Sequence, residues 1–141
     1  MDLYAENILE HYKHPRNFGL IADAKITGSD LNPLCGDKLT ASLVLDDGDK
    51  ISKFGFEGSG CAISMAAMSM LGEEILNKPI EEVENMGDER IYEMLGVEIS
   101  PARVKCALLG LSCIKKMTKL YKYEKGKKDW KTGWAGFGTF D

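Results

Sequence analysis

The sequence predicts an α+β domain, in which a small antiparallel sheet is covered by helices gathered on one face. Three observations lead to this class. A helical pattern opens the chain, strand patterns joined by a turn signal occupy its middle, and helical patterns return in the second half. This order of helix, strands and helices is typical of α+β domains. The 141 residues suffice for one domain with its own core.

The first 58 residues predict one helix and then the strands. Residues 3–14 carry apolar side chains at helical spacing and meet Pro15, which predicts an amphipathic helix. Residues 24–29 are a short strand candidate. Residues 38–58 predict two further strands, because Leu or Ala occupies every second position from 39 to 45 and an Asp-Gly turn signal lies at 46–49.

The second half predicts helices. Residues 61–77 are rich in Ala, Met and Leu and predict a buried helix that starts at or near Cys61. Residues 79–95 predict one or two short acidic helices, broken near Gly87. Residues 102–126 predict a long helix with an apolar stripe that faces the sheet. The stripe consists of Val104, Leu108, Leu111 and Tyr121, with Ile114 near it.

The last residues, 127–141, are rich in Gly and aromatic side chains and show no periodicity. We therefore expect a domain over residues 1–126 followed by a C-terminal tail at 127–141, and the sequence shows neither an internal repeat nor a second domain.

The charge is unevenly distributed along the chain. Residues 115–141 carry eight Lys against three acidic residues, a balance of +5, so the net charge of −4 leaves −9 on residues 1–114. Without an RNA-binding motif, this basic end favours a solvated helix end or an acidic protein partner over nucleic acid.

The composition is that of a globular protein, with 44% hydrophobic and 28% charged residues. No run of about 18 apolar residues is present, and the N-terminus begins neither a signal peptide nor a basic transit segment. We therefore expect a cytoplasmic protein that does not associate with a membrane. Cysteines in such a reducing compartment serve metal binding, catalysis or packing more often than disulfides.

The four cysteines differ in their surroundings. Cys35 lies in a loop that leads into a strand, Cys61 follows a Gly-Ser-Gly turn at a helix start, and Cys106 is one turn into the last helix. These ends of elements are places where distant parts of a chain converge. Cys113 lies within the apolar stripe instead, which indicates a packing residue.

Asp37, two positions after Cys35, adds a carboxylate to the three thiols. Three thiolates and one carboxylate form a four-coordinate set suited to zinc or to the irons of a cluster, and the start of a helix favours the thiolate form of Cys61. The spacing fits no zinc finger, however. Asp37 also fits a turn residue that caps its own backbone, and the glycines before Cys61 also fit a plain connection. The residues alone indicate a thiolate site and leave its ligand set open.

Other chemistry finds little support in the sequence. His11 and His14 are three residues apart at the end of the first helix, where we assign them to structure or surface. The chain lacks a Walker A sequence, G-x-G-x-x-G, G-x-S-x-G and H-E-x-x-H. Nucleotide-dependent and hydrolytic enzymes of the common types are therefore not indicated.

Four stretches resemble the iron–sulfur cluster scaffold family that includes IscU, SufU and the N-terminal part of NifU. "LYAENILEHYKHPRNFG" is similar to the family's opening, and its three cysteine motifs resemble "NPLCGD", "FEGSGCAIS" and "PARVKCALL" in the same order. The similarity covers residues 1 to about 122. It implies a SufE/NifU-like α+β fold, with a three-stranded antiparallel sheet against helices and a site at one end of the molecule.

The resemblance also implies ligands and partners. Carried over residue by residue, Cys35, Asp37, Cys61 and Cys106 match the family's cluster or metal ligands. Such proteins receive sulfur as a persulfide from a cysteine desulfurase, combine it with iron, and pass a [2Fe-2S] or [4Fe-4S] cluster to recipient apo-proteins. Cys35 or Cys106 is the candidate persulfide acceptor. A homodimer that shares one cluster remains an open alternative.

This chain differs from the branches of the family at two points, and these differences leave two functions open. The IscU branch has a histidine ligand before the third cysteine, whereas this chain has Lys105, as in the SufU branch, close enough for a supporting role beside the site. The SufU branch carries a long insertion between the second and third cysteines, for which the 44 residues between Cys61 and Cys106 leave little room. The resemblance therefore implies either a non-enzymatic scaffold or a sulfurtransferase that holds Zn²⁺ on the same residues.

Overall fold

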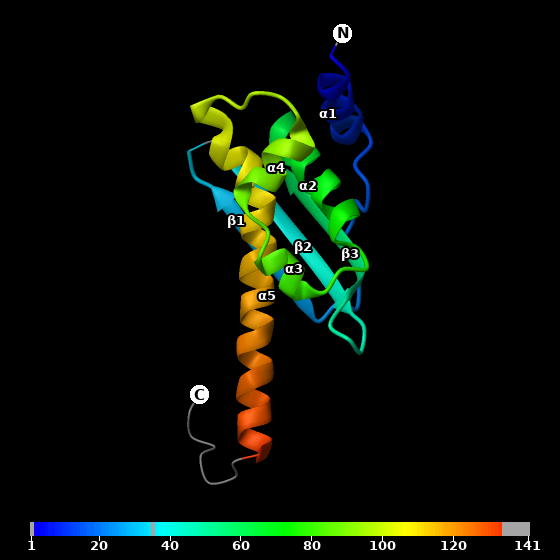
Figure 1. Cartoon of the computed structure of the whole chain (residues 1–141), viewed down its shortest axis with the longest axis vertical. Helices are drawn as coiled ribbons and strands as arrows, with labels where there is room; N and C mark the ends of the chain where they lie inside the picture. Colours follow the sequence, from blue (N-terminus) through cyan, green and yellow to red (C-terminus); the bar gives the residue numbers. More distant parts are fainter. Residues whose placement is uncertain (1, 35, 134–141) are drawn as a thin grey trace.

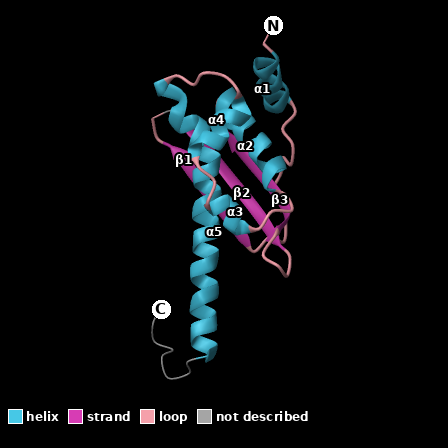
Figure 2. Ribbon diagram, viewed as in Figure 1, coloured by secondary structure: helices cyan, strands magenta, loops and turns pink. Residues whose placement is uncertain are grey.

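The computed structural model describes residues 2–34 and 36–133. Three antiparallel strands form one sheet in the order β1-β2-β3, and helices precede and follow it (Figures 1 and 2). The predicted α+β class and the three-stranded antiparallel sheet are both confirmed. The elements are α1 (Leu3–Lys13), β1 (Ile26–Asn32), β2 (Asp37–Leu45), β3 (Ile51–Ser59), α2 (Ala62–Ile75), α3 (Ile80–Glu84), α4 (Asp88–Leu95), the 3₁₀ helix η1 (Pro101–Arg103) and α5 (Val104–Gly133).

The core lies between the sheet and the helices α2 and α5. The side chains of β2 alternate between its two faces, so one row of this strand points toward the helices. That row contains Leu39, Ala41 and Leu43, all fully buried. Helix α2 is buried around most of its circumference, as its Ala- and Met-rich sequence predicts. Figure 1 shows α2 and α5 lying across the same face of the sheet.

Helix α5 approaches β1 closely at Gly28. A Cβ atom on Gly28 would lie 2.4 Å from Cγ of Met117, which no side chain tolerates without displacement. The absence of a side chain at this position therefore allows the helix to lie directly on the strand.

Three predicted boundaries differ from those observed. Helix α5 continues to Gly133 instead of ending near Gly126, so the first part of the expected tail is helical, and residues 134–141 lie outside the described residues. Strand β1 extends to Asn32, beyond the predicted end at residue 29, and β2 begins at Asp37. The connection between β1 and β2 is therefore shorter than predicted, because polar residues such as Asp30 and Asn32 continue the strand.

The predicted sheet-facing stripe of α5 is only partly correct. Leu111 and Ile114 are buried, but Val104, Leu108 and Tyr121 are half-buried. The side of α5 that meets β1 instead carries Cys113 and Met117. The error arises because α5 packs on two partners, the sheet and the helices α2 to α4, so that no single stripe describes its buried surface.

His11 joins α1 to α2 and has a structural role, as predicted. Its Nδ1 atom lies 2.7 Å from Oγ of Ser69, and its Nε2 atom lies 3.6 Å from a carboxylate oxygen of Glu73. The same Ser69 oxygen accepts the backbone N–H of Arg16 at 2.8 Å. His14 is exposed at the C-cap of α1. The two histidines therefore lie in different surroundings and do not form a pair.

Lowering the pH is expected to destabilise the fold through His11. Burial, followed by the Arg16 guanidinium, holds the pKa of His11 below its ordinary value of 6.5. The unfolded chain therefore binds more protons, and the free energy of unfolding falls as the pH drops through 6.5. Denaturant titrations at a series of pH values measure this slope. His11→Gln should have a shallower slope, whereas His14→Gln should match the wild type; equal slopes in all three proteins would contradict this role.

Among the residues that the structure describes, none of the helices combines the length and the apolar character that a bilayer crossing requires. The longest, α5, carries lysines along its exposed side, and three of them form ion pairs with the rest of the domain. These pairs are Lys116 with Asp30 at 3.0 Å, Lys122 with Glu84 at 2.7 Å and Lys125 with Asp49 at 3.1 Å. Part of the predicted basic surface is therefore neutralised within the domain.

Candidate metal centre

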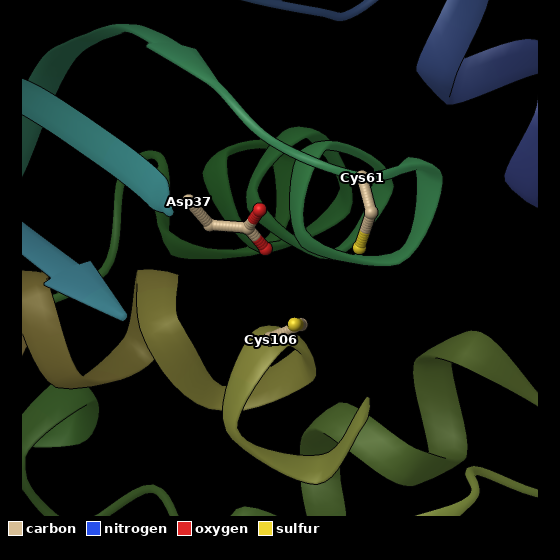
Figure 3. A group of neighbouring side chains, drawn as sticks. All are labelled: Asp37, Cys61 and Cys106. Carbon is tan, nitrogen blue, oxygen red and sulfur yellow. The ribbon is translucent and has the colours of Figure 1, made fainter. Parts of the chain in front are cut away.

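Three side chains from distant parts of the sequence meet at one end of the sheet. They come from the start of β2, the N-cap of α2 and the first turn of α5. A carboxylate oxygen of Asp37 and the sulfur atoms of Cys61 and Cys106 all lie within 4.8 Å of one another. Figure 3 shows the three side chains turned toward a common point. Three of the four predicted ligands are thus brought together, whereas Cys35 lies outside the described residues.

Asp37 is buried because of its register in the sheet. It pairs with Asn32 across the first two strands and occupies the same inward row as Leu39, Ala41 and Leu43. Only 5% of Asp37 is exposed, and its Oδ2 atom has no hydrogen-bond partner among the described residues. A buried, unpartnered carboxylate oxygen is unfavourable by itself. A cation held between this oxygen and the two sulfurs would compensate it, so the residues fit a metal site.

Cys61 lies at the N-cap of α2. Its backbone is extended and its carbonyl accepts the N–H of Met65 and the hydroxyl of Ser64, both at 3.1 Å. Its side chain makes no capping hydrogen bond. The helix therefore begins through the backbone alone, and the half-buried thiol remains available to face Asp37 and Cys106.

The glycine before Cys61 has a steric role. A Cβ atom on Gly60 would lie 2.3 Å from the Ser64 hydroxyl and 3.4 Å from Cγ of Asp37. The contact with Ser64 is too short for a side chain unless the hydroxyl moves, whereas the distance to the carboxylate is an ordinary van der Waals contact. Gly60 therefore lets the chain turn from β3 into α2 directly beside Ser64.

Cys106 is fully buried in the first turn of α5. The preceding 3₁₀ turn, η1, starts with Pro101, a residue suited to the first position of a helix. Cys61 and Cys106 therefore both lie at the start of a helical segment, where side chains from distant parts of the chain converge. The thiolate is the form of cysteine that binds metal or attacks sulfur.

Asn32 is a site residue that the sequence analysis missed. Its side-chain amide donates to the sulfur of Cys106 at 3.7 Å, and only 4% of the residue is exposed. The sequence did contain a feature that could have indicated this residue. In β1 the apolar Leu31 points outward, while the polar Asp30 and Asn32 occupy inward positions, the reverse of the usual pattern. Polar residues on the inward row of an edge strand indicate a polar interior at that end of the sheet.

Two further candidates have different surroundings. Lys105 directly precedes Cys106 and is exposed, and the ion pairs of the described residues do not join it to Asp37, so its supporting role beside the site stays a prediction. Cys113 is buried in the core, where its thiol donates to the carbonyl of Gly28 at 3.6 Å. Burial, with a smaller effect of the nearby Asp30 carboxylate, raises the pKa of Cys113 to about 11. It therefore stays a thiol at neutral pH, and its assignment to packing is confirmed.

Comparisons with known proteins agree with this arrangement. Residues 3–128 match the NifU-like N-terminal domain. The chain is 37% identical to the zinc-dependent sulfurtransferase SufU of Bacillus subtilis, an alignment that covers 81% of this chain and 88% of the relative. It is 34% identical to the iron–sulfur cluster assembly scaffold protein IscU of Aquifex aeolicus, with 88% of this chain and 79% of the relative covered.

Solved structures show the same fold. A putative iron–sulfur cluster assembly scaffold protein for the SUF system, from Fervidobacterium islandicum, superposes with a TM-score of 0.71 at 29% identity, covering 79% of this chain and 93% of the other. The N-terminal part of a NifU-like protein from Brucella abortus, with 19% identity and a TM-score of 0.68, covers 83% of this chain and 92% of the other and shares the fold. The chain therefore belongs to the family of NifU-like N-terminal domains.

Proposed function

We propose that this protein is a scaffold for the assembly of iron–sulfur clusters. It accepts sulfur from a cysteine desulfurase, binds iron, assembles a transient [2Fe-2S] or [4Fe-4S] cluster on Cys35, Asp37, Cys61 and Cys106, and passes the cluster to apo-proteins. The observation that carries the proposal is the buried Asp37 carboxylate, which has one unpartnered oxygen and lies beside two cysteine sulfurs. Sulfur and oxygen donors that converge on one point are suited to iron.

The mixed donor set suits a product that must leave. Thiolates are soft ligands that hold iron firmly, while a carboxylate is harder and exchanges more readily. Cys61 is half-buried and Cys106 fully buried, so the centre lies at the surface on one side and against the core on the other. Sulfur and iron can then enter from the solvent side, and the cluster can leave by the same route.

The lengths of the alignments also favour the scaffold. The alignment with the SufU protein of B. subtilis spans 133 positions but covers only 81% of this chain, so that relative has residues in this stretch without a counterpart here. The alignment with the IscU protein of A. aeolicus spans 125 positions and covers 88% of this chain, so almost every position of that alignment has a residue in this chain. In length this chain therefore matches the relative that is named a scaffold.

A zinc-dependent sulfurtransferase that works with the desulfurase is the second candidate, and the 37% identity to the relative of that name favours it. Cys35, Asp37, Cys61 and Cys106 would then hold Zn²⁺, which keeps bound sulfur ligands deprotonated at neutral pH. In this function Cys35 accepts the sulfane sulfur from the desulfurase. The resident metal, and not the fold, separates the two functions.

Purification without oxygen tests the proposal. Iron, acid-labile sulfide, zinc and the visible absorption spectrum are measured before and after incubation with a cysteine desulfurase, cysteine, ferrous iron and an excess of a dithiol that reduces the persulfide sulfur to sulfide. We expect a coloured cluster with matching iron and sulfide. Stoichiometric zinc that this treatment cannot replace would reject the scaffold. Desulfurase stimulation that survives replacement of all three cysteines by serine would reject the sulfurtransferase.

A further inference from the structure

The side chain of Asn32 makes two different contacts at the end of β1. Its Oδ1 atom accepts the backbone N–H of Leu34 at 3.2 Å, which helps to close the turn between β1 and β2. Its Nδ2 atom donates to Sγ of Cys106 at 3.7 Å, on an element 74 residues away in the sequence. The first contact is local and belongs to the turn. The second joins the sheet to α5 at a ligand of the metal centre.

The two contacts together fix the orientation of the amide. Since the oxygen is directed to the turn, the NH₂ group must face the sulfur. The register supports this geometry, because Asn32 and Asp37 are the last cross-strand pair of β1 and β2 and lie on the same inward face. The amide therefore reaches Cys106 from one side, while the Asp37 carboxylate approaches from a neighbouring position on the same face.

We propose that Asn32 is a positioning residue for Cys106, which it holds as the retained sulfur ligand of the centre; this inference rests on the proposed function. The N–H···S hydrogen bond withdraws electron density from the sulfur and restricts its rotation, as contacts to metal ligands do elsewhere. Exchange of metal and sulfur then takes place at Cys61, which is half-buried, and at the carboxylate of Asp37, which is the harder and more readily exchanged donor. Cys106 is fully buried and keeps its place during this exchange.

Cobalt(II) is a suitable probe, because its bonds to thiolates give strong charge-transfer bands that report on the sulfur. The protein is loaded with Co²⁺ without oxygen, and the bands and the rate of cobalt loss to a chelator are recorded for the wild type and Asn32→Ser. A serine hydroxyl accepts the N–H two residues later and so maintains the turn, but it is too short to reach Cys106. We expect the bands to move to longer wavelength and cobalt loss to accelerate about tenfold.

Two controls separate this role from folding. Asp30→Ala changes a neighbouring inward residue of β1 that contacts Ser112 and Lys116 of α5, and it should leave the bands unchanged. In a Cys106→Ser background, loaded with enough excess cobalt to saturate the weakened site, Asn32→Ser should no longer shift the remaining bands, because its sulfur partner is gone. If Asn32→Ser prevents folding, Asn32→Leu, which has the same number and branching of side-chain heavy atoms but neither a donor nor an acceptor, takes its place in the same measurements.

The outcomes distinguish this inference from the proposed function. Wild-type bands and wild-type cobalt loss in Asn32→Ser would overturn the inference and reduce Asn32 to a turn residue, while the scaffold proposal would stand. A shift that persists without the Cys106 sulfur would also overturn it. If the wild type shows no sulfur-to-cobalt bands at all, the assignment of the metal centre would be rejected, and the proposed function would be rejected with it.

Discussion

Asp37→Ala is expected to slow the loss of a bound cluster to a chelator by about tenfold. The carboxylate is the only hard donor of the described ligand set, and it offers the position at which a competing ligand enters. Alanine removes that position and leaves the cysteines in place. The change also removes a buried oxygen that lacks a partner. The metal-free variant should therefore be more stable than the wild type by about 1–2 kcal/mol.

The measurement is the decay of the visible absorption after addition of the chelator, followed in parallel for the wild type and the variant. Asp30→Ala is the matched control, because Asp30 also lies on the inward row of the sheet but pairs with Lys116 away from the centre. Its cluster should decay at the wild-type rate. Equal or faster decay in Asp37→Ala would contradict the exchange role of the carboxylate. Rapid loss of zinc from this variant would instead support the sulfurtransferase.

Cys106→Ser is expected to remove stoichiometric metal, whereas Cys113→Ser should retain it. Both cysteines are buried in α5, seven residues apart, and they differ in what surrounds the sulfur. Cys106 faces another sulfur and a carboxylate, while Cys113 faces Gly28 and Met117 of the core. A serine hydroxyl is a poor substitute for a thiolate ligand, so we expect metal affinity to fall at least about tenfold in Cys106→Ser.

The contrast between the two variants makes this test specific. Iron and zinc per chain are measured by elemental analysis after anaerobic purification, and stability is measured by denaturant titration. Cys113→Ser should cost about 1 kcal/mol of stability, since the hydroxyl can still donate to the carbonyl of Gly28. Loss of metal from both variants to the same extent would show that the measured metal does not depend on the centre described above.

The sequence alone predicted the fold class because local patterns determine it. The alternation along residues 39–45, the Asp-Gly turn and the Ala- and Met-rich run after Cys61 each describe one element without reference to the others. It missed the C-terminal extent of α5, since Lys-rich turns without an apolar stripe give no periodicity to follow. It also placed the buried face of α5 imperfectly, because that face depends on partners that the pattern of one helix does not reveal.

The sequence also identified the candidate ligands, but it did not show that their side chains lie close together. Cys61 and Cys106 were selected because cysteines at the ends of elements are able to converge, and Asp37 because it lies two residues from Cys35. On the residues alone, Asp37 fitted a turn cap better than a ligand. The resemblance to the scaffold family favoured the ligand, and the observed burial of Asp37 beside two sulfurs supports the same choice.

Asn32 is the clearest example of what only the tertiary structure decided. Its amide meets Cys106 because β1 pairs with β2 in one register and α5 lies on β1 at Gly28. Neither condition can be predicted from the residues near Asn32, since both depend on contacts between segments that are far apart in the chain. The sequence by itself therefore determined the elements and the chemical types of the ligands. The tertiary structure determined which side chains face one another, because long-range packing sets the distances on which coordination and hydrogen bonding depend.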